Sequence, residues 1–186
     1  MSTVTHLTTE QLHAGLDEIR RSPKQEGVLA LIVRRPAIDA REVLQEGQLD
    51  LVEGLAGDTW SRRGSSRSAD GLAHPEMQLN VMNARAAALV AQHADRWALA
   101  GDQLYVDLDL SGENLPPGTR LAMGTAVIEV TALPHTGCGK FVERFGLDAM
   151  KFVNSRVGRD LNLRGINARV VQPGTIRVGD AVRKLP

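Results

Sequence analysis

The sequence predicts a mainly β protein of the α+β class, in which a closed or partly closed β-barrel carries a few peripheral helices. Short apolar runs rich in β-branched residues recur along the chain, and Gly or Pro turns separate most of them. Only three segments place their apolar residues at helical spacing. Many short, turn-bounded strands are typical of barrels, and 186 residues are enough to enclose a substantial core.

The chain starts with a predicted helix and a predicted strand. Thr8 and Gln11 have the spacing of a capping box, and apolar residues then recur at helical intervals at Leu12, Leu16 and Ile19. The triplet RSP ends this helix, because the residue before a proline is displaced from helical geometry. Residues 27–35 form an apolar run that a proline stops, which predicts a strand. We expect residues 1–35 to pack on a barrel domain formed by residues 36–186.

The rest of the chain alternates loops, helices and strands. Residues 61–78 are rich in Ser, Gly and Arg and predict a long surface loop. Asn83 is positioned to cap a helix over residues 84–99, and residues 141–155 have the spacing of a further helix. The sequence QPGT at 172–175 has the Pro-Gly centre of a type II turn, so the last two strands are expected to form a hairpin.

Composition limits the classes of function. The 22 basic and 22 acidic side chains balance, which argues against a broad nucleic-acid-binding surface. The N-terminus lacks the pattern of a secretory signal, and no apolar run approaches the length of a membrane span. A single cysteine excludes an internal disulfide framework. We expect a cytoplasmic protein that binds neither nucleic acid nor membrane.

Three clusters are candidates for anion or ligand binding, each with a structural alternative. Asp58, in the turn GLAGDTW, either orients a ligand or only shapes a tight turn. Three cations of the 61–78 loop, which also contains serines, either hold a phosphate or keep the loop soluble: Arg62, Arg63 and Arg67. Glu113 and Asn114, in SGENL, follow a strand and bind either a ligand or loop backbone.

The fourth candidate is the lone thiol of Cys138, which would be a catalytic residue. It lies in the bend LPHTGCGKF just before a predicted helix, where backbone N–H groups favour a thiolate. His135 and Lys140 add a proton acceptor and a positive charge, while Gly137 and Gly139 leave the sulfur open. The alternative is a buried structural cysteine, but a glycine-flanked bend favours a functional thiol.

Four blocks in order resemble the MOSC family, named for the C-terminal domain of molybdenum cofactor sulfurases. They are GLAGD, SGENL, MGTAVIEVTALPHTGCGKF and RGINARVVQPGTIRVGDAV, spread over residues 54–182. The resemblance implies a mainly β barrel of the small free-standing bacterial type and the molybdenum cofactor, molybdopterin, as ligand. It also implies that Cys138 carries sulfur or contacts the molybdenum. His135 and Gly137 stand where many relatives have Arg and Pro.

The resemblance leaves three functions open. The first is a molybdopterin-binding, sulfur-handling protein, supplied with sulfur by a partner such as a cysteine desulfurase. The second is a molybdenum-dependent reductase of N-hydroxylated compounds that draws electrons from a separate electron-transfer protein. The third is a non-catalytic module that binds a small anion or a partner protein. The expected cofactor-binding residues are Asp58, the three loop arginines, Glu113, Asn114, His135 and Lys140. In the first two functions Cys138 is the reactive residue.

Overall fold

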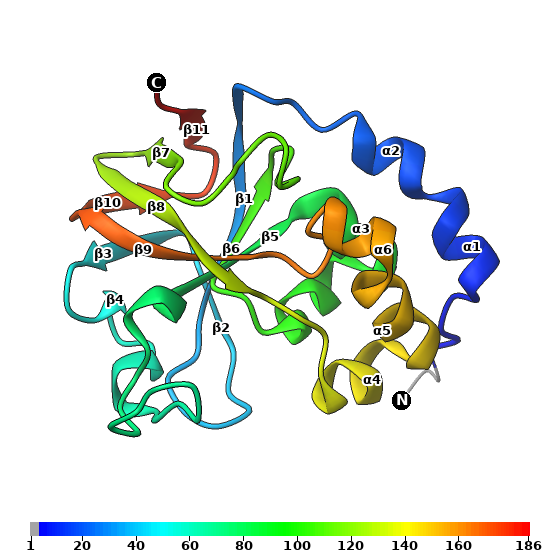
Figure 1. Ribbon diagram of the computed structural model, residues 1–186, viewed down its shortest axis with the longest axis horizontal. Helices are drawn as coiled ribbons and strands as arrows, with labels where there is room; N and C mark the ends of the chain where they lie inside the picture. The colour runs from blue at the N-terminus through cyan, green and yellow to red at the C-terminus, as the bar shows by residue number, and fades with distance from the viewer. Residues whose placement is uncertain (1–3) are drawn as a thin grey trace.

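Seven strands close into a barrel in the computed structural model, which describes residues 4–186 (Figure 1). Their order is β11-β7-β8-β9-β5-β6-β1, and a pairing of β1 with β11 completes the circle. The strands β5 and β6 run parallel, and the other pairs of this circle are antiparallel. The barrel strands are β1 (Glu26–Arg34), β5 (Leu79–Asn83), β6 (Leu104–Asp107), β7 (Arg120–Met123), β8 (Ala126–Pro134), β9 (Ile166–Gln172) and β11 (Ala181–Lys184).

A second, smaller sheet extends the strand-rich part of the molecule. Its order is β10 (Gly174–Arg177), β3 (Glu46–Asp50) and β4 (Gly54–Leu55), while β2 (Glu42–Leu44) adds to β1 at the edge of the barrel. The expected hairpin of the last two strands is therefore wrong. The strand after QPGT pairs with β3, and β11 pairs with β7 and β1, because closing the barrel draws these strands to partners distant in sequence.

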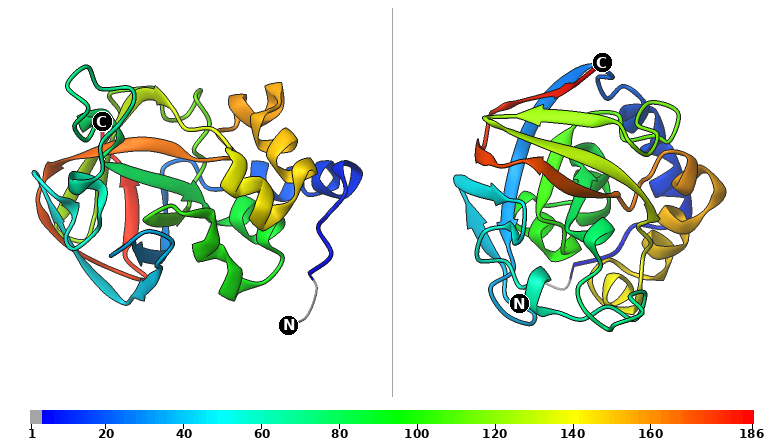
Figure 2. Two further views of the ribbon diagram at one scale, coloured as in Figure 1. Left: turned by 90° about the horizontal axis from the view of Figure 1, so that it is seen from below. Right: turned by 60° about the vertical axis from the view of Figure 1, so that its left-hand side comes forward.

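Helices cover one end of the barrel (Figures 1 and 2). The α-helices are α1 (Thr9–Ala14), α2 (Leu16–Arg20), α3 (Ala84–Ala91), α4 (Gly139–Phe145), α5 (Leu147–Asn154) and α6 (Arg156–Asp160). The 3-10 helices are η1 (Trp60–Arg62), η2 (Pro75–Met77) and η3 (Ala94–Ala100). No helix of the described chain is long and apolar enough to cross a membrane.

The predicted helices form, but they are interrupted. The capping box of Thr8 and Gln11 is present, and Asn83 accepts the N–H of Ala86 as the cap of α3. The helix expected over 84–99 ends at Ala91 and continues as η3, because Gln92 adopts a φ of 64°. Gly146, with a φ of 90°, likewise divides the segment 141–155 into α4 and α5. A positive φ is incompatible with a continuous helix.

Two hydrophobic clusters hold the fold together. The first fills the barrel, as β8 illustrates: Ala126, Ile128 and Val130 point inward, whereas Glu129 points outward to Arg120 and Arg169. The second lies between the barrel and the helices, and includes three aromatic side chains of α4 and α5: Phe141, Phe145 and Phe152. The strand β1 serves both clusters and pairs with β6 and β11, so the segment 1–35 supplies one of the barrel's own strands.

Candidate functional site

The cysteine bend connects β8 to α4 and exposes its thiol. Cys138 is exposed and takes the N-cap position of α4 in an extended conformation. The bend is held by a two-way contact with Asn154 of α5. The N–H of Gly137 donates to Asn154 Oδ1 at 2.8 Å, and Asn154 Nδ2 donates to the Gly137 carbonyl at 3.1 Å. The sulfur is therefore accessible on a fixed piece of backbone.

A cavity of about 360 Å³ opens beside this thiol and is strongly cationic. We call it the arginine cavity. Five arginines, one lysine and a single carboxylate contribute to its wall together with Cys138: Arg35, Arg41, Arg63, Arg144, Arg164, Lys140 and Asp39. Its volume falls within the range of about 300–1,000 Å³ of small-molecule sites. A concave wall of guanidinium groups is suited to phosphate and carboxylate ligands.

Two of these arginines have no acidic partner. Among residues 4–186, no carboxylate forms an ion pair with Arg41 or Arg63. Burial, followed by the charges of Arg144 and Arg35, lowers the pKa of Arg41. Burial of its guanidinium, followed by the charge of Arg35, lowers the pKa of Arg63, although this residue as a whole is exposed. Both cations remain charged, and an anion in the cavity would relieve their mutual repulsion.

The other cations are held by carboxylates that fix their positions. Asp58 accepts hydrogen bonds from Nε and Nη2 of Arg35, each at 2.9 Å, and both side chains are buried. At the rim, Asp39 binds Lys140 at 2.7 Å and Arg144 at 3.2 Å, and these contacts, first of all the hydrogen bond from Lys140, lower the pKa of Asp39. The structure thus gives Asp58 a positioning role toward the cavity, through Arg35.

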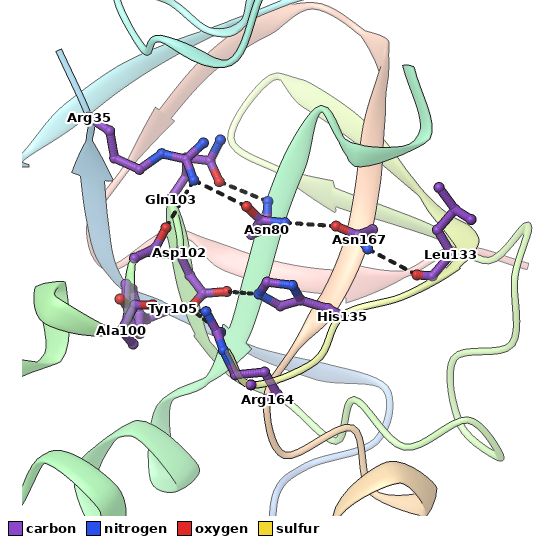
Figure 3. A network of polar contacts seen from close by, with 12 residues as sticks. Arg35, Asn80, Ala100, Asp102, Gln103, Tyr105, Leu133, His135, Arg164 and Asn167 are labelled. Atoms are coloured by element: carbon purple, nitrogen blue, oxygen red, sulfur yellow. Dashed lines mark hydrogen bonds and ion pairs between the residues drawn. The ribbon is translucent and has the colours of Figure 1, made fainter. Parts of the chain in front are cut away.

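A third carboxylate, that of Asp102, links Arg164 of the arginine cavity to His135 (Figure 3). Asp102 is fully buried. It accepts a hydrogen bond from Arg164 Nη1 at 2.6 Å, and its other oxygen lies 3.0 Å from His135 Nε2. Burial opposes the charge of Asp102, but Arg164 and then His135 favour it more strongly, so the pKa of Asp102 falls to about 2. Burial, followed by the charge of Arg164, lowers the pKa of His135 in spite of Asp102.

His135 also lines a neighbouring cavity of about 250 Å³, which we call the histidine cavity. The two cavities share Arg35 and Arg63 in their walls. Amide side chains continue the polar network beneath them: Asn80 accepts from Arg35 and donates to Asn167, which donates to the Leu133 carbonyl (Figure 3). This buried network connects the residue after β1 with β5, β9 and the end of β8, just before the cysteine bend.

The structure brings together some of the residues expected from the sequence and separates others. Cys138, Arg63 and Lys140 line the arginine cavity, Asp58 lies behind it, and His135 lies next to it. Arg62 and Arg67 of the same loop line neither cavity. Glu113 lines a separate cavity of about 730 Å³, and Asn114 donates to the carbonyls of Lys24 and Asp109. The SGENL block thus lies away from the thiol.

Sequence reasoning missed much of the cationic wall. The missed residues are Arg35, Arg41, Arg144, Arg164 and their buried partner Asp102. Arg35 is the last residue of the predicted strand 27–35, where the chain enters a loop, and binding residues are common on loops. The others stand singly in unremarkable segments, and only the folded chain brings them to one place.

Comparison with known proteins agrees with this architecture. Residues 68–183 match the family model of the MOSC domain. No curated protein matches the chain. Among solved structures, the YUAD protein of Bacillus subtilis has 14% identity and a TM-score of 0.59, covering 84% of this chain and 94% of its own. YiiM of Escherichia coli has 18% identity and a TM-score of 0.54, covering 86% of this chain and 70% of its own.

YiiM of Geobacillus stearothermophilus is similar in fold as well, with 13% identity, a TM-score of 0.53, and coverage of 88% of this chain and 74% of its own. Identities this low show a shared fold and no more. The family match, in contrast, spans more than half of the 186 residues and includes the cysteine bend. This chain is therefore a member of the MOSC domain family.

Proposed function

We propose that the protein binds the molybdenum cofactor at the arginine cavity, with Cys138 as the thiol that carries sulfur or contacts the metal. The observation that carries this proposal is the position of the chain's single cysteine. It is exposed on the wall of a cavity with two arginines that have no acidic partner within residues 4–186. The MOSC family is associated with this cofactor, which makes it the first ligand to test.

The residues present fit the chemistry of such a ligand. Arg41 and Arg63 would bind the phosphate of the pterin, because guanidinium groups bind phosphate through two parallel hydrogen bonds. Cys138 supplies one soft sulfur ligand, and the remaining metal ligands would come with the cofactor. When bound, the cofactor supplies a redox-active metal. The polypeptide itself holds the anion, orients the cofactor and presents the thiol.

The test exploits two adjacent arginines of one loop. Arg63 lines the arginine cavity, whereas Arg62 does not, so Arg62→Gln is a matched control for Arg63→Gln. Each variant is purified from a molybdate-supplied host, and its pterin and molybdenum contents are measured. A hydrogen bond to a charged group contributes about 1.5–3 kcal/mol, so we expect pterin affinity to fall about 10- to 100-fold in Arg63→Gln alone.

Cys138→Ser separates anion binding from sulfur chemistry. This variant should keep its pterin and lose molybdenum or labelled sulfur, because serine is a poor ligand for a soft metal. Equal pterin contents in Arg62→Gln and Arg63→Gln, or wild-type protein without pterin, would contradict the proposal. Wild-type protein that binds inorganic phosphate but neither pterin nor molybdenum would instead be an anion-binding module. Turnover of a hydroxylamine with an added electron-transfer system would identify a reductase.

A further inference from the structure

The histidine cavity combines a base with a cation and an apolar wall. Its wall includes His135 and Arg63, and also Trp60 and Met77, which offer flat and apolar surface. Of these four residues, only Arg63, which both cavities share, takes part in the proposed binding of the molybdenum cofactor.

The hydrogen bond to Asp102 fixes the tautomer of His135. The pKa of Asp102 lies at about 2, so this carboxylate is ionised at neutral pH and only accepts hydrogen bonds. It faces His135 Nε2 at 3.0 Å, which places the ring proton on Nε2. Because the pKa of His135 is lowered, first of all by burial, the ring is neutral at pH 7 and Nδ1 carries a lone pair.

The packing of the ring directs this lone pair. A Cβ placed on Gly165 would lie 3.2 Å from His135 Cδ2, so the Cδ2 edge of the ring faces Gly165. The Nδ1 edge is the opposite edge and faces away from that residue. Among residues 4–186, no donor forms a hydrogen bond with Nδ1. His135 thus offers a free acceptor beside the histidine cavity.

We infer that the histidine cavity binds a small planar weak acid, such as a phenol or a heterocyclic lactam, and that His135 Nδ1 takes the proton from its O–H or N–H group. The proton moves to Nδ1 while the bonding electron pair stays on the ligand. The ring then carries a proton on each nitrogen, and Asp102 accepts the Nε2 proton. The ligand becomes an anion, and the total charge does not change.

The charge beside the ligand favours this transfer, whereas the surroundings of the ring as a whole oppose it. Arg63 lines the same cavity without an acidic partner among the described residues, and so would stabilise the ligand anion. At the ring, burial, Arg164 and Arg35 oppose the imidazolium more strongly than Asp102 stabilises it. Stabilisation of the ligand anion by Arg63 therefore has to drive the transfer. The titratable and charged groups around His135 come from five segments: Asp102 before β6, Arg164 before β9, Arg35 after β1, Arg63 after η1 and His74 before η2.

The test uses 4-nitrophenol and the full chain without added cofactor, because this probe absorbs differently when ionised. At pH 6.5 the free probe is mainly protonated, so a phenolate band that appears on adding protein reports proton transfer in the complex. We expect this band with wild-type protein and a loss of about tenfold or more in His135→Gln, since an amide cannot take up the proton. His93→Gln removes an exposed histidine and should behave as wild type.

Two outcomes would overturn the inference. One is a phenolate band of equal size in His135→Gln and His93→Gln, and the other is binding of the phenol to wild-type protein without ionisation. Should His135→Gln fail to fold, ¹⁵N NMR of wild-type protein decides: an unprotonated Nδ1 whose shift moves on adding the probe supports the inference, and a protonated Nδ1 refutes it. The result does not depend on molybdenum or pterin, so the proposed function stands or falls separately.

Discussion

Replacing Asp102 by asparagine removes the charge that holds two buried groups. The Asp102 side chain is fully buried, and that of Arg164 is 8% exposed. Arg164 Nε already lacks a partner among the described residues, and its guanidinium lies 5.1 Å from the centre of the Phe141 ring. An asparagine keeps the shape of the side chain but leaves the Arg164 cation without a compensating charge.

Two arguments give the size of the effect. Lowering the pKa of Asp102 from 3.8 to about 2 corresponds to about 2 kcal/mol of stabilisation. Removing one partner of a buried ion pair typically costs about 3–5 kcal/mol, because the remaining charge stays desolvated. We therefore expect Asp102→Asn to lower the free energy of unfolding by about 2–5 kcal/mol at pH 7.

Urea unfolding followed by tryptophan fluorescence measures this change, with Asp17→Asn as control. Asp17 forms an ion pair with Arg20 but is 83% exposed, so its loss should cost less than about 0.5 kcal/mol. The stabilisation by Asp102 is present above pH 3.8 and is lost as pH falls toward 2, so only the wild-type protein should show this acid-dependent loss.

In Asp102→Asn, the new amide should also donate a hydrogen bond to His135 Nε2 and shift the ring proton to Nδ1. A cost below about 1 kcal/mol would refute the buried ion pair as a stabilising element.

Two further changes test the parts next to the thiol. Asn154→Ala removes both hydrogen bonds to Gly137 and should lower the free energy of unfolding, measured in urea, by about 1–2 kcal/mol. The Gly137 amide should also exchange its hydrogen faster. An unchanged exchange rate would show that other contacts hold the bend. Below pH 6.5 the unfolded chain binds a proton at His135 more readily than the folded chain, so stability should fall as pH drops from 6.5 through the lower pKa of the folded state. The difference between wild type and His135→Gln isolates this effect, and parallel pH profiles would contradict it.

Local patterns in the sequence predicted the elements of the fold well. The capping box at Thr8, the cap at Asn83 and the strand before Pro36 all depend on neighbours within a few residues, and all are present. The failures depend on distant partners. The turn QPGT was expected to pair neighbouring strands, but β10 pairs with β3, more than 120 residues earlier in the chain. Barrel closure decides this pairing, and no short segment encodes it.

The same distinction explains the site. Cys138, flanked by glycines in a bend, could be found from the sequence because its setting is local. The three arginines of the loop looked alike there, yet only Arg63 lines the arginine cavity. Arg144 and Arg164 gave no signal, since each stands in an ordinary helical or loop segment. Their shared position depends on how α4 and the start of β9 meet the end of the barrel.

The cationic wall joins two parts of the chain that the family match divides. Cys138, Lys140, Arg144 and Arg164 lie within residues 68–183, whereas Arg35, Arg41 and Arg63 precede them. The earlier part also supplies β1, which closes the barrel between β6 and β11. A chain shortened to the matched segment would therefore lose a barrel strand together with Arg41 and Arg63, for which the described residues provide no acidic partner. The thiol and the arginines proposed to bind the anion come from opposite sides of that boundary, so the segment before residue 68 belongs to the candidate site as well as to the barrel.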